Sequence, residues 1–195
     1  MSDRPRLVMA SANPKKVAEI GEILADWDIA PRPADLADVD ETEPDFIGNA
    51  RLKAVAVCEA AGLPALADDS GIEVAALDGA PGVRSARFAG EPSDDAANRR
   101  LLLERLDGVE DRRARFRSVV MVRFPDGREL ITEGTVDGVI AHAERGEHGF
   151  GYDSLFVPDE GDGATFAEMD PAAKHAMSHR GRALRSLVEL LGHEG

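Results

Sequence analysis

Two adjacent aspartates, Asp68 and Asp69, follow a short apolar segment and precede Ser70 and Gly71. Two carboxylates about 4 Å apart repel by roughly 4 kcal/mol at an effective dielectric constant near 20, unless a cation or hydrogen-bond donors offset the repulsion. Carboxylates suit Mg²⁺, which binds through one or two of them together with water and substrate phosphates. Because successive strand residues point to opposite faces, the pattern places one aspartate in such a site. The alternative is an ordinary acidic turn.

A second candidate site is the segment Ser11–Lys16, which follows a predicted strand at Leu7–Ala10. Asn13 is suited to cap a helix that begins at Pro14, and the amino end of a helix binds phosphate through its N–H groups and dipole. Lys15 and Lys16 add cations where the helix dipole alone disfavours them, which favours an anionic ligand. A Walker A sequence is absent. The alternative is a capped helix with solvated lysines.

Two further segments carry residues that suit a nucleoside. Gly149–Asp153 places Phe150 and Tyr152 among glycines, in a chain with only 5% aromatic residues, so the backbone can approach a ligand and a ring can stack on a base. Lys174, His179 and Arg180 follow, and one straight helix cannot point all three toward a common ligand. A break at Met177–Ser178, with Ser178 capping a new helix, would bring them together. The alternatives are a plain turn and a basic, solvated helix end.

Several elements must position these residues. Helices are predicted from Pro14 to about Leu24, from Phe46 to Ala61 with Gly62 as the C-cap, from a Ser93 cap to Leu106, and from Pro171 to Leu191. A strand at Leu63–Ala67 ends at the aspartate pair, and a hairpin joins Phe116–Phe124 to Glu129–Thr135 through Pro125-Asp126-Gly127. Early strands and helices alternate while the middle is antiparallel, which predicts an α/β fold with a mixed sheet flanked by helices.

The chain has 195 residues and a formal net charge of −14, which disfavours binding to a nucleic-acid polymer. The longest apolar run is far below the roughly 20 residues that cross a bilayer, so no membrane contact is expected. Cys58 is the only cysteine, and the segment 1–5 has no apolar signal core, so a cytoplasmic location is expected. Four arginines have no assigned role and could belong to an interface, a surface or a salt-bridge network: Arg112, Arg113, Arg115 and Arg117.

Taken together and in this order, the segments resemble the inosine/xanthosine triphosphate pyrophosphatase family over nearly the whole chain. The motifs that carry the resemblance are Ser11–Lys16, Phe46–Ala54, Ala67–Gly71, Gly79–Gly82 with Ser85–Arg87, Gly149–Asp153 and Ser178–Gly181. Three positions depart from the family pattern: Ala12 and Glu43 stand where glycine is frequent, and Gly48 stands where an acidic residue often precedes Asn49. The last two departures concern acidic helpers around the metal.

The resemblance implies one domain over residues 1–195 with an elongated, two-lobed fold, a nucleotide cleft between the lobes and a homodimer. It also implies Mg²⁺-dependent hydrolysis of non-standard purine nucleoside triphosphates (ITP, dITP and XTP) to the monophosphate and pyrophosphate. Asp69 matches the catalytic base and a metal ligand, and Glu41 matches a second metal contact. The residues that match substrate contacts are Ser11, Ala12, Asn13, Pro14, Lys15, Lys16, Lys53, Ser70, Phe150, Gly151, Tyr152, Asp153, Lys174, His179 and Arg180.

Base selection would follow from Arg180, if it donates to O6 of hypoxanthine or xanthine, where adenine presents an amino donor. Phe150 would stack on the base. Two other functions compete with this hypothesis: a nucleotide-binding regulator without turnover, which the aspartate pair disfavours, and a pyrophosphatase for modified pyrimidines, which Ser178-His179-Arg180 disfavours. The sequence ranks neither the three purine substrates nor the number of metal ions, and it leaves open whether the exposed side of the predicted hairpin forms the dimer interface.

Overall fold

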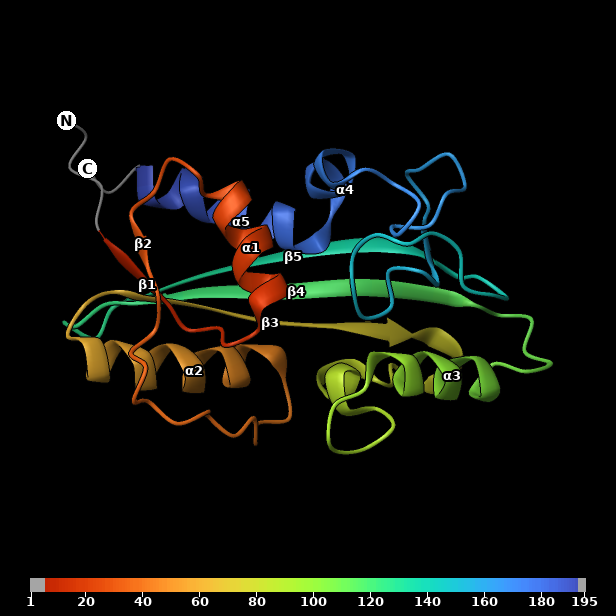
Figure 1. The fold of residues 1–195 in the computed structure, drawn as a ribbon, viewed down its shortest axis with the longest axis horizontal. Coiled ribbons are helices and arrows are strands. Elements are labelled where there is room, and N and C mark those ends of the chain that lie inside the picture. Colours follow the sequence, from red (N-terminus) through yellow and green to blue (C-terminus); the bar gives the residue numbers. More distant parts are fainter. Residues whose placement is uncertain (1–5, 193–195) are drawn as a thin grey trace. The chain divides into compact units, whose positions relative to one another are not determined.

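A computed structural model describes residues 6–192, so the segment 1–5, which bears on a signal sequence, lies outside the described residues. A six-stranded mixed sheet in the order β2-β1-β3-β4-β5-β6 is flanked by helices (Figure 1). The strands are β1 (Leu7–Met9), β2 (Ile29–Ala30), β3 (Ala65–Val74), β4 (Arg113–Arg123), β5 (Glu129–Ile140) and β6 (Phe156–Pro158). The helices are α1 (Pro14–Ile23), α2 (Phe46–Ala61), α3 (Asp95–Arg105), α4 (Pro171–Met177) and α5 (His179–Gly192). β1 pairs in parallel with β2 and β3, whereas β5 and β6 are antiparallel, so the predicted mixed α/β sheet is confirmed.

The chain divides into two compact units, and β3, β4 and β5 each contribute residues to both. The first unit comprises residues 6–69, 118–134 and 180–192 of the described chain. Its core joins β1, β3 and β4 to α1 and α5 through residues such as Leu7, Ile20 and Leu184, which are inaccessible to solvent. Within this unit α1 and α5 lie on one side of the strands and α2 lies on the other (Figure 1).

The second unit comprises residues 70–117 and 135–179. Its core contains Phe116, Phe156 and Phe166, whose rings contact one another with centroids 4.7 to 5.9 Å apart. The unit also carries the 3-10 helices Ala75–Leu77 and Gly82–Arg87. The prediction that the two units act as lobes of one domain, with a cleft between them, stays a prediction.

The local signals for helices and the hairpin are confirmed at most ends. Asn13 Oδ1 accepts hydrogen bonds from the backbone N–H groups of Lys15 and Lys16, and Gly62 ends α2 in the left-handed conformation with φ 64°. β4 and β5 are neighbours in the sheet, and the turn between them is closed by hydrogen bonds between Phe124 and the residues Gly127 and Arg128. The predicted break at Met177–Ser178 separates α4 from α5.

Several predicted boundaries are wrong: β3 begins at Ala65 rather than Leu63, β4 begins at Arg113 rather than Phe116, and β5 ends at Ile140 rather than Thr135. Asp94, not Ser93, caps α3, because the Asp94 carboxylate accepts from the N–H groups of Ala96 and Ala97, while the Ser93 hydroxyl donates to the Ala86 carbonyl. β3 does not end at the aspartates but continues through them to Val74. Partners on both faces of the sheet supply the charges that let two carboxylates lie inside a buried strand. Among residues 6–192, no helix is long and apolar enough to cross a membrane.

Candidate functional site

Asp68 belongs to a buried charge cluster in the first unit. Its carboxylate oxygen Oδ2 lies 3.1 Å from Lys16 Nζ on α1 and 3.2 Å from Arg180 Nε on α5. The other end of the Arg180 guanidinium lies 2.5 Å from the Glu19 carboxylate, also on α1. Arg180 and Glu19 are 2% and 5% exposed, so both charges depend on these partners rather than on water. The cluster ties α1 and α5 to β3.

Asp69 belongs to a separate cluster, built with α2 and the loop before it. Lys53 Nζ donates to Asp69 Oδ1 at 2.9 Å, to Glu41 Oε1 at 2.9 Å and to the Asp68 backbone carbonyl at 2.7 Å. Three acceptors match the three N–H donors of an ammonium group, which fixes the Lys53 side chain. The two aspartates therefore face different cations, as the alternation of side chains along a strand requires.

The same clusters shift the pKa values of the two aspartates in opposite directions. Burial opposes ionisation of Asp68, but Lys16, Arg180 and Lys53 outweigh it and lower the pKa of this carboxyl. Burial dominates at Asp69 and, with the negative charge of Glu41, raises its pKa despite the attraction of Lys53. Burial alone would lower the pKa of Lys53, yet Asp69, Asp68 and Glu41 raise it. Asp69 is thus the more basic carboxylate of the pair.

The segment Ser11–Lys16 has its own internal hydrogen bonds. Besides the two N–H groups that Asn13 caps, the N–H of Asn13 donates to Ser11 Oγ at 3.2 Å. Lys15 is exposed, and Lys16 extends to Asp68 while burial lowers its pKa. Ala12 and Pro14 are exposed beside them. Phosphate binding by this segment stays a prediction that concerns the lysine side chains and the exposed loop.

In the second unit, Asp153 organises the predicted glycine-aromatic segment. Its Oδ2 accepts from the Phe150 N–H at 2.9 Å and from Lys174 Nζ at 2.8 Å, and the Lys174 ammonium lies 5.1 Å from the centre of the Phe150 ring. The Gly151 N–H donates to the Asp95 carboxylate. Tyr152 is buried, with its hydroxyl donating to the Ser85 carbonyl, and burial raises its pKa. Phe150, Asp153 and Lys174 therefore form one cluster, from which Tyr152 points into the core.

The predicted cations near the helix break have separate partners. His179 is buried in the second unit, its ring stacked on Phe116 with centroids 4.5 Å apart, whereas Arg180 belongs to the Asp68 cluster of the first unit. Ser70, half-buried, begins the second unit directly after Asp69. The chain thus passes from one unit to the other within two of the predicted motifs. A common site for Lys174, His179 and Arg180 stays a prediction.

Comparison with known proteins identifies the family. The model of the Ham1 family matches residues 7–190. The chain belongs to the Ham1 family. It is similar to the dITP/XTP pyrophosphatase of Aromatoleum aromaticum, with 52% identity over 95% of this chain and 96% of that protein, and to that of Caulobacter vibrioides, with 50% identity over 95% and 97%. Its fold matches the solved HAM1 protein of Coxiella burnetii with a TM-score of 0.88 and 41% identity, over 97% of this chain and 99% of that one.

In this Ham1 chain, two departures from the family pattern are adjacent in space. Asn49, buried at the start of α2, accepts from the Glu43 N–H and donates to the Glu43 carbonyl, which holds Glu43 against the helix. A Cβ atom at Gly48 would lie 2.5 Å from the Glu43 Cβ. The glycine at position 48 therefore makes room for the side chain at position 43.

Glu19, the second carboxylate on Arg180, was not predicted from the sequence. Its spacing of three residues from Lys16 placed it on the same face of α1, but nothing marked that face as lying against Arg180. The four arginines without an assigned role fall into two groups. Arg113, Arg115 and Arg117 pair with Asp111, Asp137 and Glu73, whereas Arg112 is buried without an ion pair in the described chain.

The residues around Asp69 fit a Mg²⁺ ion. Asp69 Oδ2 is buried and has no hydrogen-bond partner among the described residues, and Glu41 supplies a second carboxylate through the shared Lys53. Within residues 6–192 no group of three or more His, Cys, Asp or Glu side chains forms a ready metal cage. Two carboxylates suit Mg²⁺, which completes its coordination with water and substrate phosphates.

Proposed function

We propose that this protein hydrolyses non-standard purine nucleoside triphosphates to the monophosphate and pyrophosphate, with dITP and XTP among its substrates. The proposal rests on family membership, on the names of relatives that are about 50% identical over nearly the whole chain, and on one observation in the site. That observation is the pairing of a buried, more basic carboxylate, Asp69, with the cation Lys53 and a second carboxylate, Glu41.

Asp69 is the proposed general base. A carboxylate with a raised pKa accepts a proton from water more readily than an ordinary aspartate, and such a base typically contributes about 10²–10⁴-fold to the rate. Lys53 donates to both Asp69 and Glu41, which fixes the orientation of Asp69. Its positive charge also offsets the repulsion between the two carboxylates. The water that loses its proton would attack the α-phosphorus and release pyrophosphate.

Mg²⁺ is the proposed cofactor, held by Asp69 and Glu41. When bound, it neutralises part of the triphosphate charge and makes the phosphorus more electrophilic. Lys15 and Lys16, with Ser11, Ala12, Asn13 and Pro14, are the proposed triphosphate contacts at the start of α1, and Lys53 and Ser70 are proposed beside Asp69. Lysine side chains near the phosphates stabilise the negative charge that develops in the transition state.

The nucleoside contacts proposed in the second unit are Phe150, Gly151, Asp153, Lys174 and His179, with Tyr152 contributing its backbone because its side chain lies in the core. The salt bridge between Lys174 and Asp153 supports a preformed wall beside the Phe150 ring, which can stack on a base. Arg180 is the proposed donor to O6 of the base. Because Asp68 and Glu19 hold its guanidinium, its direction is fixed in advance, which favours discrimination against adenine.

The experiment that tests this function is a substrate panel with Mg²⁺: ITP, dITP, XTP, dUTP and the standard nucleotides, with pyrophosphate release as the readout. The expected result is a kcat/KM for the three non-standard purines at least about 100-fold above that for ATP, as expected where a buried donor is left unpaired. Binding of ITP without pyrophosphate release would instead indicate a regulator. Preference for dUTP would indicate a pyrophosphatase of modified pyrimidines.

A homodimer acting in the cytoplasm is the remaining part of the proposal. The nucleotide pool is its proposed substrate reservoir, and a buried, single thiol at Cys58 agrees with a reducing compartment. Light scattering coupled to gel filtration tests the dimer, because a mass near twice 20.8 kDa is expected. A mass of one chain at micromolar concentration would contradict it.

A further inference from the structure

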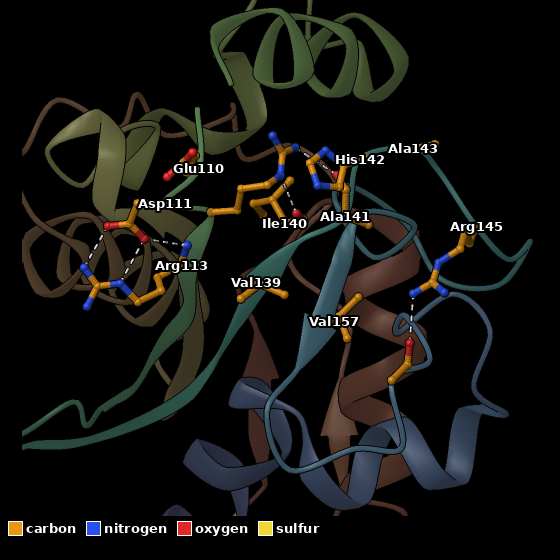
Figure 2. A pocket seen from close by; sticks show the side chains of 12 residues that line it. Glu110, Asp111, Arg113, Val139, Ile140, Ala141, His142, Ala143, Arg145 and Val157 are labelled. Atoms are coloured by element: carbon orange, nitrogen blue, oxygen red, sulfur yellow. Dashed lines mark hydrogen bonds and ion pairs between the residues drawn. The ribbon is translucent and has the colours of Figure 1, made fainter. Parts of the chain in front are cut away.

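The second unit contains a hollow whose lining includes none of the residues assigned to the candidate site. Its volume is about 640 Å³, in the range of small-molecule pockets, and Figure 2 shows it from close by. A smaller hollow of about 470 Å³ adjoins it and shares Glu110, Arg112 and His142 with it. All the lining residues of both belong to the second unit.

Arg112 is the unusual residue of this hollow. It is 9% exposed and makes no ion pair among residues 6–192, and burial without a counter-charge lowers its pKa. Its Nε, Nη1 and Nη2 donate to the carbonyls of Ile140, Leu106 and Ala141, at 2.7, 2.9 and 3.0 Å. A guanidinium has five N–H donors, so three carbonyls leave two donors and a full positive charge. A carbonyl offsets a buried cation only in part, which favours an anion beside it.

The surroundings of Arg112 suit an anion with an apolar part. Arg113 and Arg145 lie on opposite sides of Val139 and Val157 (Figure 2). The two valines are opposite each other in the β5–β6 ladder, and Val139 is 37% exposed, so they form an apolar floor. Of the three arginines in the lining, Arg113 pairs with Asp111, whose pKa it lowers to about 2, and Arg145 pairs with Glu168 outside the lining. Arg112 is therefore the lining arginine without an ion pair among residues 6–192.

We propose that this hollow binds an organic phosphate monoester, with its phosphate on Arg112 and its apolar group on Val139 and Val157. A phosphate dianion matches the planar fork of a guanidinium and compensates more positive charge than a carboxylate does. The volume of the hollow, its apolar floor and the cation Arg112 all suit this class of ligand. The inference does not depend on the proposed pyrophosphatase function, because no residue is shared with that site.

The experiment follows the side-chain Nε–H resonance of Arg112 by NMR during titration with phenyl phosphate, inorganic phosphate and benzoate. The expected result is a saturable shift of this resonance and of the amides of Ala141 and His142. Phenyl phosphate should bind at least about threefold more tightly than either other probe. The absence of a shift at about 20 mM phenyl phosphate, a concentration that reveals millimolar affinity, would overturn the proposal. Equal affinity for inorganic phosphate would overturn the apolar part, and equal affinity for benzoate would overturn the preference for a dianion.

A matched pair of variants separates the hollow from the candidate active site. Val139→Glu places a carboxylate on the floor and should weaken phenyl phosphate binding at least about tenfold. Ile131→Glu is the control, because Ile131 lies on the same strand with 38% exposure but belongs to the first unit. Both variants should release pyrophosphate from ITP at the rate of the unchanged protein. Unchanged phenyl phosphate affinity in Val139→Glu would contradict the proposal, whatever the outcome of the substrate panel.

Discussion

At the scale of single residues, Asp68 and Asp69 carry the same functional group in opposite electrostatic surroundings. Lys16 and Arg180 stabilise the charge of Asp68, while burial and Glu41 raise the pKa of Asp69. A carboxylate held by two cations is a poor base, and one with a raised pKa is a better base. We therefore expect Asp69 to be the base in the proposed reaction, and Asp68 to hold α1 and α5 on the strand.

Replacement of Asp69 tests the first of these assignments. Asp69→Asn keeps the size of the side chain but removes the base, so kcat for ITP should fall about 10²–10⁴-fold. Asp35→Asn, at an exposed position of the same unit, is the control and should leave kcat unchanged. Circular dichroism should show the same fold for both variants. Near-normal turnover in Asp69→Asn would remove Asp69 from the catalytic step.

Replacement of Asp68 tests the second assignment through pH. The folded-state pKa of Asp68 lies below its ordinary value of 3.8, so its charge adds stability above that pH, and the contribution is lost as the pH falls through the folded pKa. Asp68→Asn should lower the free energy of unfolding by about 3–5 kcal/mol at pH 7, because it leaves buried cations unpaired. Urea titrations should show this difference shrinking below about pH 4. A difference that is constant from pH 7 to pH 3 would mean that Asp68 is not charged in the folded protein.

At the scale of elements, the connection of helices to β3 positions the site. α1 contributes Lys16 and Glu19, α2 contributes Lys53, and α5 contributes Arg180, each from the helix end or face that meets the strand. The Thr132 hydroxyl on β5 donates to the Ala183 carbonyl, which holds α5 to the sheet a second time. Each of these long side chains has a defined position, because a helix holds its backbone and a carboxylate binds its charged end.

The cap of α3 gives a prediction at this scale. Asp94→Ala removes the acceptor of two helix N–H groups and should lower the free energy of unfolding by about 1 kcal/mol, while Asp94→Asn should cost much less. Guanidinium titrations of the three proteins measure the difference. If Asp94→Ala and Asp94→Asn destabilise equally, the lost charge rather than the lost acceptor explains the effect.

At the scale of the whole molecule, an acidic chain can bind a triphosphate only where the local electrostatic potential is positive. The formal net charge is −14, yet Lys15, Lys16 and Lys53 belong to the candidate site. A metal ion at Asp69 and Glu41 would add to this positive potential, and it would also bind only the folded chain. Metal binding should therefore be visible both in activity and in stability.

Metal removal supplies the corresponding prediction. EDTA should abolish pyrophosphate release, and excess Mg²⁺ should restore it. Without substrate, Mg²⁺ at about 100 times its Kd should add about 2.7 kcal/mol of stability and raise Tm by roughly 5–10 °C. Differential scanning calorimetry should show this rise in the unchanged protein and a much smaller one in Glu41→Gln. An equal rise in both would place the ion elsewhere.

The extent of sequence-based prediction differs between local and long-range features. Asn13, Gly62 and the break after Met177 were predictable because caps and turns depend on neighbours a few residues away. Ser93 was chosen as the cap of α3 because both serine and aspartate cap helices. The structure distinguishes the two residues, since the Ser93 hydroxyl donates to the Ala86 carbonyl and Asp94 caps the helix. Glu19 was missed because its partner Arg180 is distant in the chain.

The sequence by itself determined the family motifs, the mixed α/β sheet and the residue types available for chemistry, since these depend on local pattern and order. Only the tertiary structure decided that β3 continues through both aspartates, that Asp68 and Asp69 have different cations, and that Tyr152 lies in the core. It also decided that Arg112 is buried without a counter-ion in the described chain. The physical reason is that the free energy of a charge depends on its burial and on the partners that folding brings to it.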